Sequence, residues 1–237
     1  MPNTSLSRVP GLIAVAALAA AVAGCGGSAG TAAQSSRTTQ DAKTTSVYTA
    51  TQLRSALLAT VNGVKPAVPV ESGAYGSLPG VKATKQSLSG VKITPARCAS
   101  AGGTGLSSPK YAKVSATVAT FRVGRDGLSE VLLAPPSSLL AAALADRFPA
   151  GCAHYTAKVG DRLFSYAIKE EQAPRLGVAA RELNVRASGD ESENIWTVIY
   201  RTRGLVGAVT LVGQNASRAT AEALARKAYD YAQKTLV

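Results

Sequence analysis

The stretch RELNVRASGDESENIWTVIYRTRGLVGAVTLV, residues 181–212, contains three predicted strands in succession. Residues 181–187, 194–202 and 205–212 are rich in the β-branched, aromatic and aliphatic side chains that favour strands. A Ser-Gly-Asp-Glu turn separates the first two strands, and Gly204 separates the last two. Because short turns place consecutive strands side by side in opposite directions, this stretch predicts an antiparallel meander.

The last strand of the meander is apolar on both of its faces. One face carries Leu205, Val209 and Leu211, and the other carries Val206, Ala208 and Val212. A strand with this pattern lies inside a sheet that is covered on both sides. We therefore expect residues 205–212 to form a central, covered strand.

The regions before and after the meander supply further strands and helices. Two hairpins are predicted upstream, from residues 110–123 with 128–134 and from 153–159 with 162–169. Helices are predicted at 49–61, at 137–148 and at 217–236. The sequence thus predicts a single α+β domain, in which an antiparallel sheet of six to seven strands is packed by about three helices.

Residues 63–103 do not show a clear period. This segment holds four prolines and seven glycines, which predicts a long irregular connection with one short element near residues 86–92. Such a connection needs something to hold it against the domain, and Cys98 is the residue suited to do so.

The N-terminus has the features of an export signal. Arg8 precedes residues 11–23, thirteen residues without a polar side chain. A bilayer core needs about 20 such residues, so this run has the length of a signal peptide rather than of a membrane span. The run ends in Val22-Ala23-Gly24-Cys25, which resembles the bacterial lipobox.

A lipobox implies cleavage between Gly24 and Cys25 and attachment of lipid to the Cys25 thiol. The alternative is a plain secretory signal with an incidental cysteine. Lipidation supplies several acyl chains, which give the stable membrane anchoring that one chain does not. We therefore predict a lipoprotein signal peptide at 1–24, a lipidated cysteine with a flexible Gly/Ser/Thr-rich tether at 25–47, and an extracytoplasmic domain at 48–237.

Charge and location together limit the partners. Loss of Arg8 with the signal leaves 25 basic and 14 acidic residues, a net charge of +11. Outside the cytoplasm, nucleic acid and ATP are poor partners for this charge. The basic residues are expected to meet anionic lipid headgroups or wall polymers, or simply to keep the protein soluble. We expect a protein attached to the outer side of the cell membrane through its lipid.

Two cysteines remain if Cys25 is acylated. Cys98 and Cys152 in an exported domain predict one disulfide, which closes a loop of 55 residues. The chain-entropy relation gives such a bridge roughly 4 kcal/mol. The alternative is that Cys152 and His154, which share a strand face, act as a nucleophile and base.

Other candidate sites are weaker. Arg201 and Arg203 have the same strand parity, and they could form an anion-binding patch with Arg181 or Arg186; the alternative is a set of solvent-facing charges. One histidine and three scattered cysteines are too few for a zinc finger or a clustered His-metal site, so no metal or other cofactor is expected.

Several of these features together resemble actinobacterial lipoproteins of the PknH-like extracellular sensor type. They are the lipobox, the tether, the helix at 49–61, the Thr-Pro-Ala-Arg-Cys motif at 94–98 and the Arg-Phe-Pro-Ala-Gly-Cys motif at 147–152. The family members carry four cysteines in two bridges, whereas this domain has two. The resemblance implies a sensor-like module that binds something at the cell envelope and has no activity of its own.

Three functions follow from these observations. The first is a non-enzymatic envelope lipoprotein that binds an unidentified ligand or protein partner. The second is a carrier of lipid or glycolipid, which needs a deep apolar cavity. The third is a hydrolase of wall material, which needs a convergent acid and base that no spacing in this sequence displays.

Overall fold

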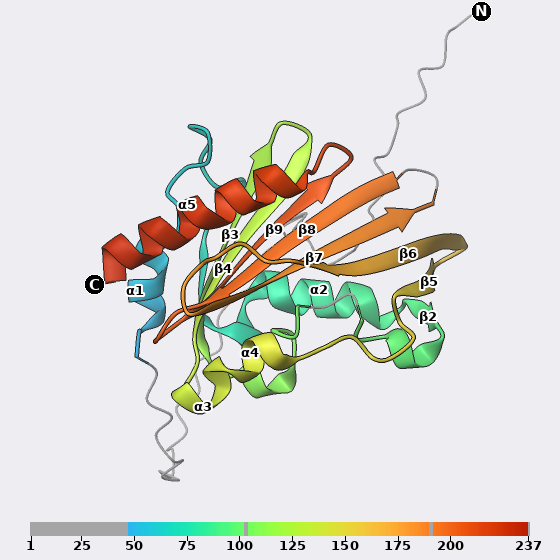
Figure 1. Ribbon diagram of the computed structural model, residues 1–237, viewed down its shortest axis with the longest axis horizontal. Helices are drawn as coiled ribbons and strands as arrows, with labels where there is room; N and C mark the ends of the chain where they lie inside the picture. Colours follow the sequence, from blue (N-terminus) through green and yellow to red (C-terminus); the bar gives the residue numbers. More distant parts are fainter. Residues whose placement is uncertain (1–46, 102–103, 190–191, 237) are drawn as a thin grey trace, which may run out of the picture.

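Nine antiparallel strands form the sheet of the computed structural model, which describes residues 47–101, 104–189 and 192–236 (Figure 1). The strands are β1 (Glu71–Ala74), β2 (Lys92–Thr94), β3 (Ser115–Val123), β4 (Asp126–Ala134), β5 (His154–Val159), β6 (Arg162–Glu171), β7 (Ala179–Ser188), β8 (Ser192–Arg201) and β9 (Val206–Gly213). Their order across the sheet is β1-β3-β4-β9-β8-β7-β6-β5-β2.

The predicted meander forms the middle of this sheet. β9 lies between β4 and β8, so the expected central position of residues 205–212 is confirmed. Val209 and Leu211 pack into the core on one face, and Val206 and Ala208 pack into the core on the other. The apolar residues on both faces of this strand therefore reflect two separate layers of cover.

Helices cover both faces of the sheet. On one face, α1 and α5 pack against β3, β4, β8 and β9, and Figure 1 shows α5 crossing the sheet with α1 beside its C-terminal end. On the other face lie α2, α3, α4 and the short 3-10 turns. These elements are α1 (Ala50–Ser55), α2 (Pro79–Ser89), α3 (Ser137–Leu140), α4 (Ala142–Ala145), α5 (Arg218–Leu236), η1 (Tyr75–Ser77), η2 (Ala96–Cys98) and η3 (Pro109–Tyr111).

The final helix agrees with its sequence pattern. The Ser217 hydroxyl accepts a hydrogen bond from the backbone N–H of Thr220 at 3.2 Å, so a serine precedes α5 as a cap. The inner face is buried and is made mainly of alanine, which lets the helix axis lie close to the strands. Its buried residues are Ala221, Leu224, Ala225, Ala228 and Ala232.

The first helix is shorter than the predicted 49–61. Its start is as expected, because Thr49 and Gln52 form a reciprocal capping box. The helix ends at Ser55, and the backbone N–H of Leu58 donates to a carboxylate oxygen of Glu130 at 3.0 Å instead of to a helical carbonyl. A hydrogen bond to the sheet thus ends a helix that periodicity alone would continue.

The segment 63–103 is more ordered than predicted. It contains β1, β2 and α2, and the two extra strands raise the sheet from the predicted six or seven strands to nine. The Glu71 carboxylate accepts hydrogen bonds from the Gly80 backbone N–H at 2.9 and 3.0 Å, in the first turn of α2. A carboxylate from the strand thereby replaces the missing side-chain cap of this helix.

The predicted helix at 137–148 is broken into α3 and α4 and stops at Ala145. Pro136, rather than a serine, occupies the N-cap of α3. Asp146 adopts an extended backbone, and its carbonyl accepts a hydrogen bond from Arg181 while its carboxylate pairs with Lys110 at 3.1 Å. These contacts hold the chain away from a helical path.

Among the described residues, no helix is long and apolar enough to cross a bilayer.

Candidate functional site

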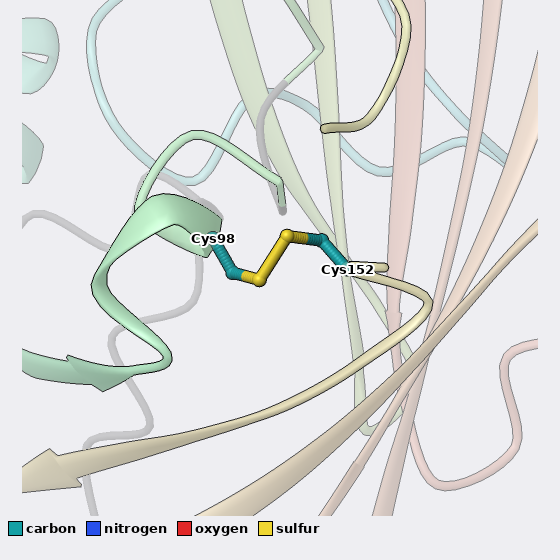
Figure 2. The surroundings of a disulfide bond; sticks show 2 residues. All are labelled: Cys98 and Cys152. Atoms are coloured by element: carbon teal, nitrogen blue, oxygen red, sulfur yellow. A yellow bond between two sulfur atoms is a disulfide. The ribbon is translucent and has the colours of Figure 1, made fainter. Parts of the chain in front are cut away.

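The two cysteine motifs singled out in the sequence meet in the structure. Cys98 at the end of η2 and Cys152 just before β5 form a disulfide, with the Cα atoms 5.4 Å apart (Figure 2). Both cysteines are fully buried. Beside them Gly151 has a φ of +76°, and a Cβ at that position would lie 3.3 Å from the guanidinium of Arg97. Gly24 and Cys25 lie outside the described residues.

The disulfide bears on the alternative of a Cys-His pair. The Cys152 sulfur is bonded to Cys98, so it is not free to attack a substrate. His154 is exposed at the start of β5. The structure therefore does not bring a free thiol and an imidazole together.

Arg181 forms a buried ion pair within the fold and does not belong to an exposed basic patch. Its side chain is 4% exposed and forms a two-pronged ion pair with Glu170, with Nε–Oε1 at 3.1 Å and Nη2–Oε2 at 3.3 Å. The guanidinium also lies 5.1 Å from the centre of the Phe148 ring. Arg181 thus attaches the connection between α4 and β5 to the sheet.

Among the other arginines suggested for the patch, Arg201 lies close to Arg181, because the register pairs Arg181 with Ile199, two positions before Arg201. Arg186 lies at one end of β7, near the turn to β8. Arg201 and Arg203 lie at the other end of the sheet, where β8 turns into β9. The structure therefore does not bring Arg186 to Arg201 and Arg203, and it leaves Arg181, the other residue suggested for the patch, paired with Glu170.

A buried carboxyl on β4 is a feature that the sequence analysis missed. Glu130 is 1% exposed, and burial raises its pKa to about 7 despite the hydrogen bond from the Leu58 N–H. Its second oxygen and the Tyr200 hydroxyl have no hydrogen-bond partner among the described residues. This carboxyl lies under α1, enclosed by the core.

A second buried carboxyl lies under the start of α5. Glu182 on β7 is fully buried, and its Oε2 lies 3.0 Å from Nη2 of Arg218. Arg218 also pairs with Glu222 at 2.7 Å and donates to the Gln172 carbonyl. Burial raises the pKa of Glu182 to about 7, while the charge of Arg218 acts in the opposite direction. This cluster attaches the first turn of α5 to the sheet.

An open hollow of about 760 Å³ runs along α5. Its lining includes a row of alternating charge at helical spacing, formed by Glu222, Arg226, Asp230 and Lys234. Tyr231 contributes an aromatic surface near the end of the helix. A lipid carrier needs a deep apolar cavity, whereas this hollow is open to solvent and five of its nine lining residues are charged. Across the described ranges, no group of three or more His, Cys, Asp or Glu side chains is placed to hold a metal ion.

No protein-family model matches the chain, and no curated protein matches it. Among solved structures, the extracellular domain of PknH from Mycobacterium tuberculosis is similar, with 14% identity, a TM-score of 0.44, and coverage of 61% of this chain and 78% of that one. An uncharacterised protein from Mycobacterium smegmatis, an Rv0999 ortholog, is similar at 13% identity, with a TM-score of 0.42 and coverage of 61% and 77%.

The first of these structures is of the type that the sequence resemblance indicated, so this chain has structural neighbours among mycobacterial proteins that include the PknH extracellular domain. At these TM-scores and identities, no functional conclusion rests on the likeness.

Proposed function

We propose that this chain is a lipoprotein held at the extracytoplasmic face of the cell membrane by lipid on Cys25. In this proposal its domain binds an envelope ligand or protein partner and has no catalytic activity. The observation that carries the proposal is Val22-Ala23-Gly24-Cys25, which follows directly on a thirteen-residue apolar run. The proposed parts are a signal peptide at 1–24, the lipidated cysteine and tether at 25–47, and the binding domain at 48–237.

The disulfide supports an extracytoplasmic location. Structural disulfides form and persist in oxidising compartments and are rare in reducing ones. Cys98 and Cys152 are fully buried, and their bond joins the irregular stretch after β2 to the start of β5. The domain is thus suited to a compartment in which thiols are oxidised.

The buried ionisable groups support the proposed absence of catalysis. Arg181 is occupied by Glu170, and Glu182 lies against Arg218 at the base of α5. Glu130 is enclosed by the core and receives the Leu58 N–H. These groups make contacts between elements of the fold. A catalytic acid or base must instead be able to reach a substrate.

Cell fractionation tests the proposal. The Cys25→Ala variant should leave the membrane fraction, because the anchoring thiol is gone, while a matched Ser28→Ala variant in the tether should remain there. Membrane association of both variants to the same extent would contradict lipid anchoring. Turnover of peptidoglycan or ester substrates by the purified wild-type protein would contradict the absence of catalysis.

A further inference from the structure

The point at which the N-terminal segment joins the domain lies at one end of the sheet. The Tyr48 hydroxyl donates to the Leu236 carbonyl near the end of α5 at 3.5 Å. Gly204, in the turn from β8 to β9, faces Val47 and Tyr48, and a Cβ at Gly204 would lie 3.0 Å from the Tyr48 ring. The start of the domain, the β8–β9 turn and the end of α5 therefore meet at one place. This place lies at the end of the molecule that carries the label C in Figure 1.

The three segments that meet there are basic. Residues 47–55, 201–205 and 231–236 contain four Lys or Arg and no Asp or Glu, and the nearest acid along these segments is Asp230. Arg54, Arg203 and Lys234 are exposed. The end of the domain that follows the tether thus presents a net positive charge.

The same end exposes large apolar side chains. Val47 is 59% exposed and Tyr231 is 38% exposed. Val178 is 58% exposed and belongs to this end because its backbone N–H donates to the Arg201 carbonyl at 2.7 Å. Basic residues mixed with exposed apolar and aromatic side chains are typical of surfaces that lie on anionic bilayers. We call this set the anchor-end surface: Val47, Arg54, Val178, Arg203, Tyr231 and Lys234.

We propose that the anchor-end surface lies against the headgroups of anionic phospholipids in the bilayer that holds the lipid of Cys25. This inference rests on the proposed anchor. A chain of the 21 residues between Cys25 and Val47 spans at most about 75 Å. The anchor therefore keeps this end of the domain close to the membrane, which raises its effective concentration there.

Contact at this end gives the domain a defined orientation. The β3–β4, β5–β6 and β7–β8 turns all lie at the opposite end of the sheet, because the register places Asp126, Arg162 and Ser192 at the end remote from the β8–β9 turn. In the proposed orientation these three turns face away from the bilayer, where they are accessible to other envelope components.

Acetylation of lysines on the lipidated protein tests the inference. The protein is extracted from membranes and reconstituted in vesicles of pure phosphatidylcholine or of phosphatidylcholine with 30% phosphatidylglycerol, an amount of about one anionic lipid in three. We expect acetylation of Lys234 to slow about tenfold on the anionic vesicles, and this effect to disappear in high salt. Lys158, near the remote turns, is the internal control and should react equally on both vesicles.

Charge reversal adds a matched pair of variants at exposed turns. Arg203→Glu should restore rapid acetylation of Lys234, whereas Arg125→Glu in the β3–β4 turn should leave it slow. If Lys234 of the wild-type protein reacts equally on both vesicles, the inference is overturned, whatever the variants do.

Flotation of the same samples separates this inference from the proposed anchor. Flotation with both vesicles, without slower acetylation of Lys234, overturns the surface contact alone. Flotation with anionic vesicles only, with slow acetylation of Lys234, supports the contact and contradicts the anchor. Flotation with neither vesicle contradicts both.

Discussion

At the scale of single residues, the carboxyl of Glu130 links stability to pH. Burial raises its pKa to about 7 from an ordinary value of 4.5, so between these pH values the folded protein binds more protons at this site than the unfolded chain does. Stability contributed by the neutral form is therefore lost as the pH rises from about 4.5 to about 7.

The Glu130→Gln variant should remove this dependence. Between pH 4.5 and pH 8 the wild-type protein should lose about 2 to 3 kcal/mol of unfolding free energy that the variant keeps, because glutamine carries no charge to bury. Denaturant titrations of both proteins across this range measure the difference. Glu182 is present in both and so contributes equally. Parallel stability curves for the two proteins would show that Glu130 does not titrate as described.

Gly207 lies where a neighbouring side chain leaves no room for a Cβ atom. A Cβ at Gly207 would lie 2.1 Å from the Tyr200 ring on the paired strand, and Tyr200 is fully buried. The Gly207→Ala variant should therefore lose about 2 kcal/mol of stability through overpacking. Gly127→Ala, on β4, meets no atom within 4 Å and serves as the control in the same urea titrations. Equal stability of the two variants would contradict the close packing of Tyr200.

The sequence contains a signal for one of the two buried carboxyls and none for the other. Glu130 has the same strand parity as Leu128 and Leu132, which places it on a buried face. Glu182 has Ala180 and Asn184 as its neighbours of the same parity, a pattern that does not separate a buried face from an exposed one. Which carboxyls are buried depends on helices that are remote in sequence.

At the scale of elements, the disulfide holds a weakly structured stretch to the sheet. Cys98 and Cys152 are separated by 54 positions, and a closed loop of this size stabilises the fold by about 4 kcal/mol. Replacing both cysteines with serine should lower the free energy of unfolding by about that amount.

Thiol titration of the unfolded, unreduced mature chain should find no free sulfhydryl on either residue, and finding about two per chain would contradict the bridge.

The strands and helices with clear periods were predictable, and the short ones were not. β3 to β9 alternate or are apolar over six to ten residues, so their side chains alone indicate strands. β1 and β2 have four and three residues and form only by pairing with β3 and β5 at the edges. The early end of α1 similarly depends on Glu130, a residue 72 positions away from Leu58.

At the scale of the whole molecule, location determines the function that we propose. The buried disulfide fits an oxidising compartment, and the basic and apolar anchor-end surface fits a position on a bilayer. The remote turns are then the part of the domain that other molecules reach. The proposed function depends on attachment of the chain to the membrane through one residue.

Mass spectrometry of the N-terminal peptide from the membrane-extracted protein tests that attachment most directly. We predict a peptide that begins at Cys25 and carries a diacylglycerol group on its sulfur. A peptide that begins at Met1, or one that contains an unmodified Cys25, would contradict the lipid anchor.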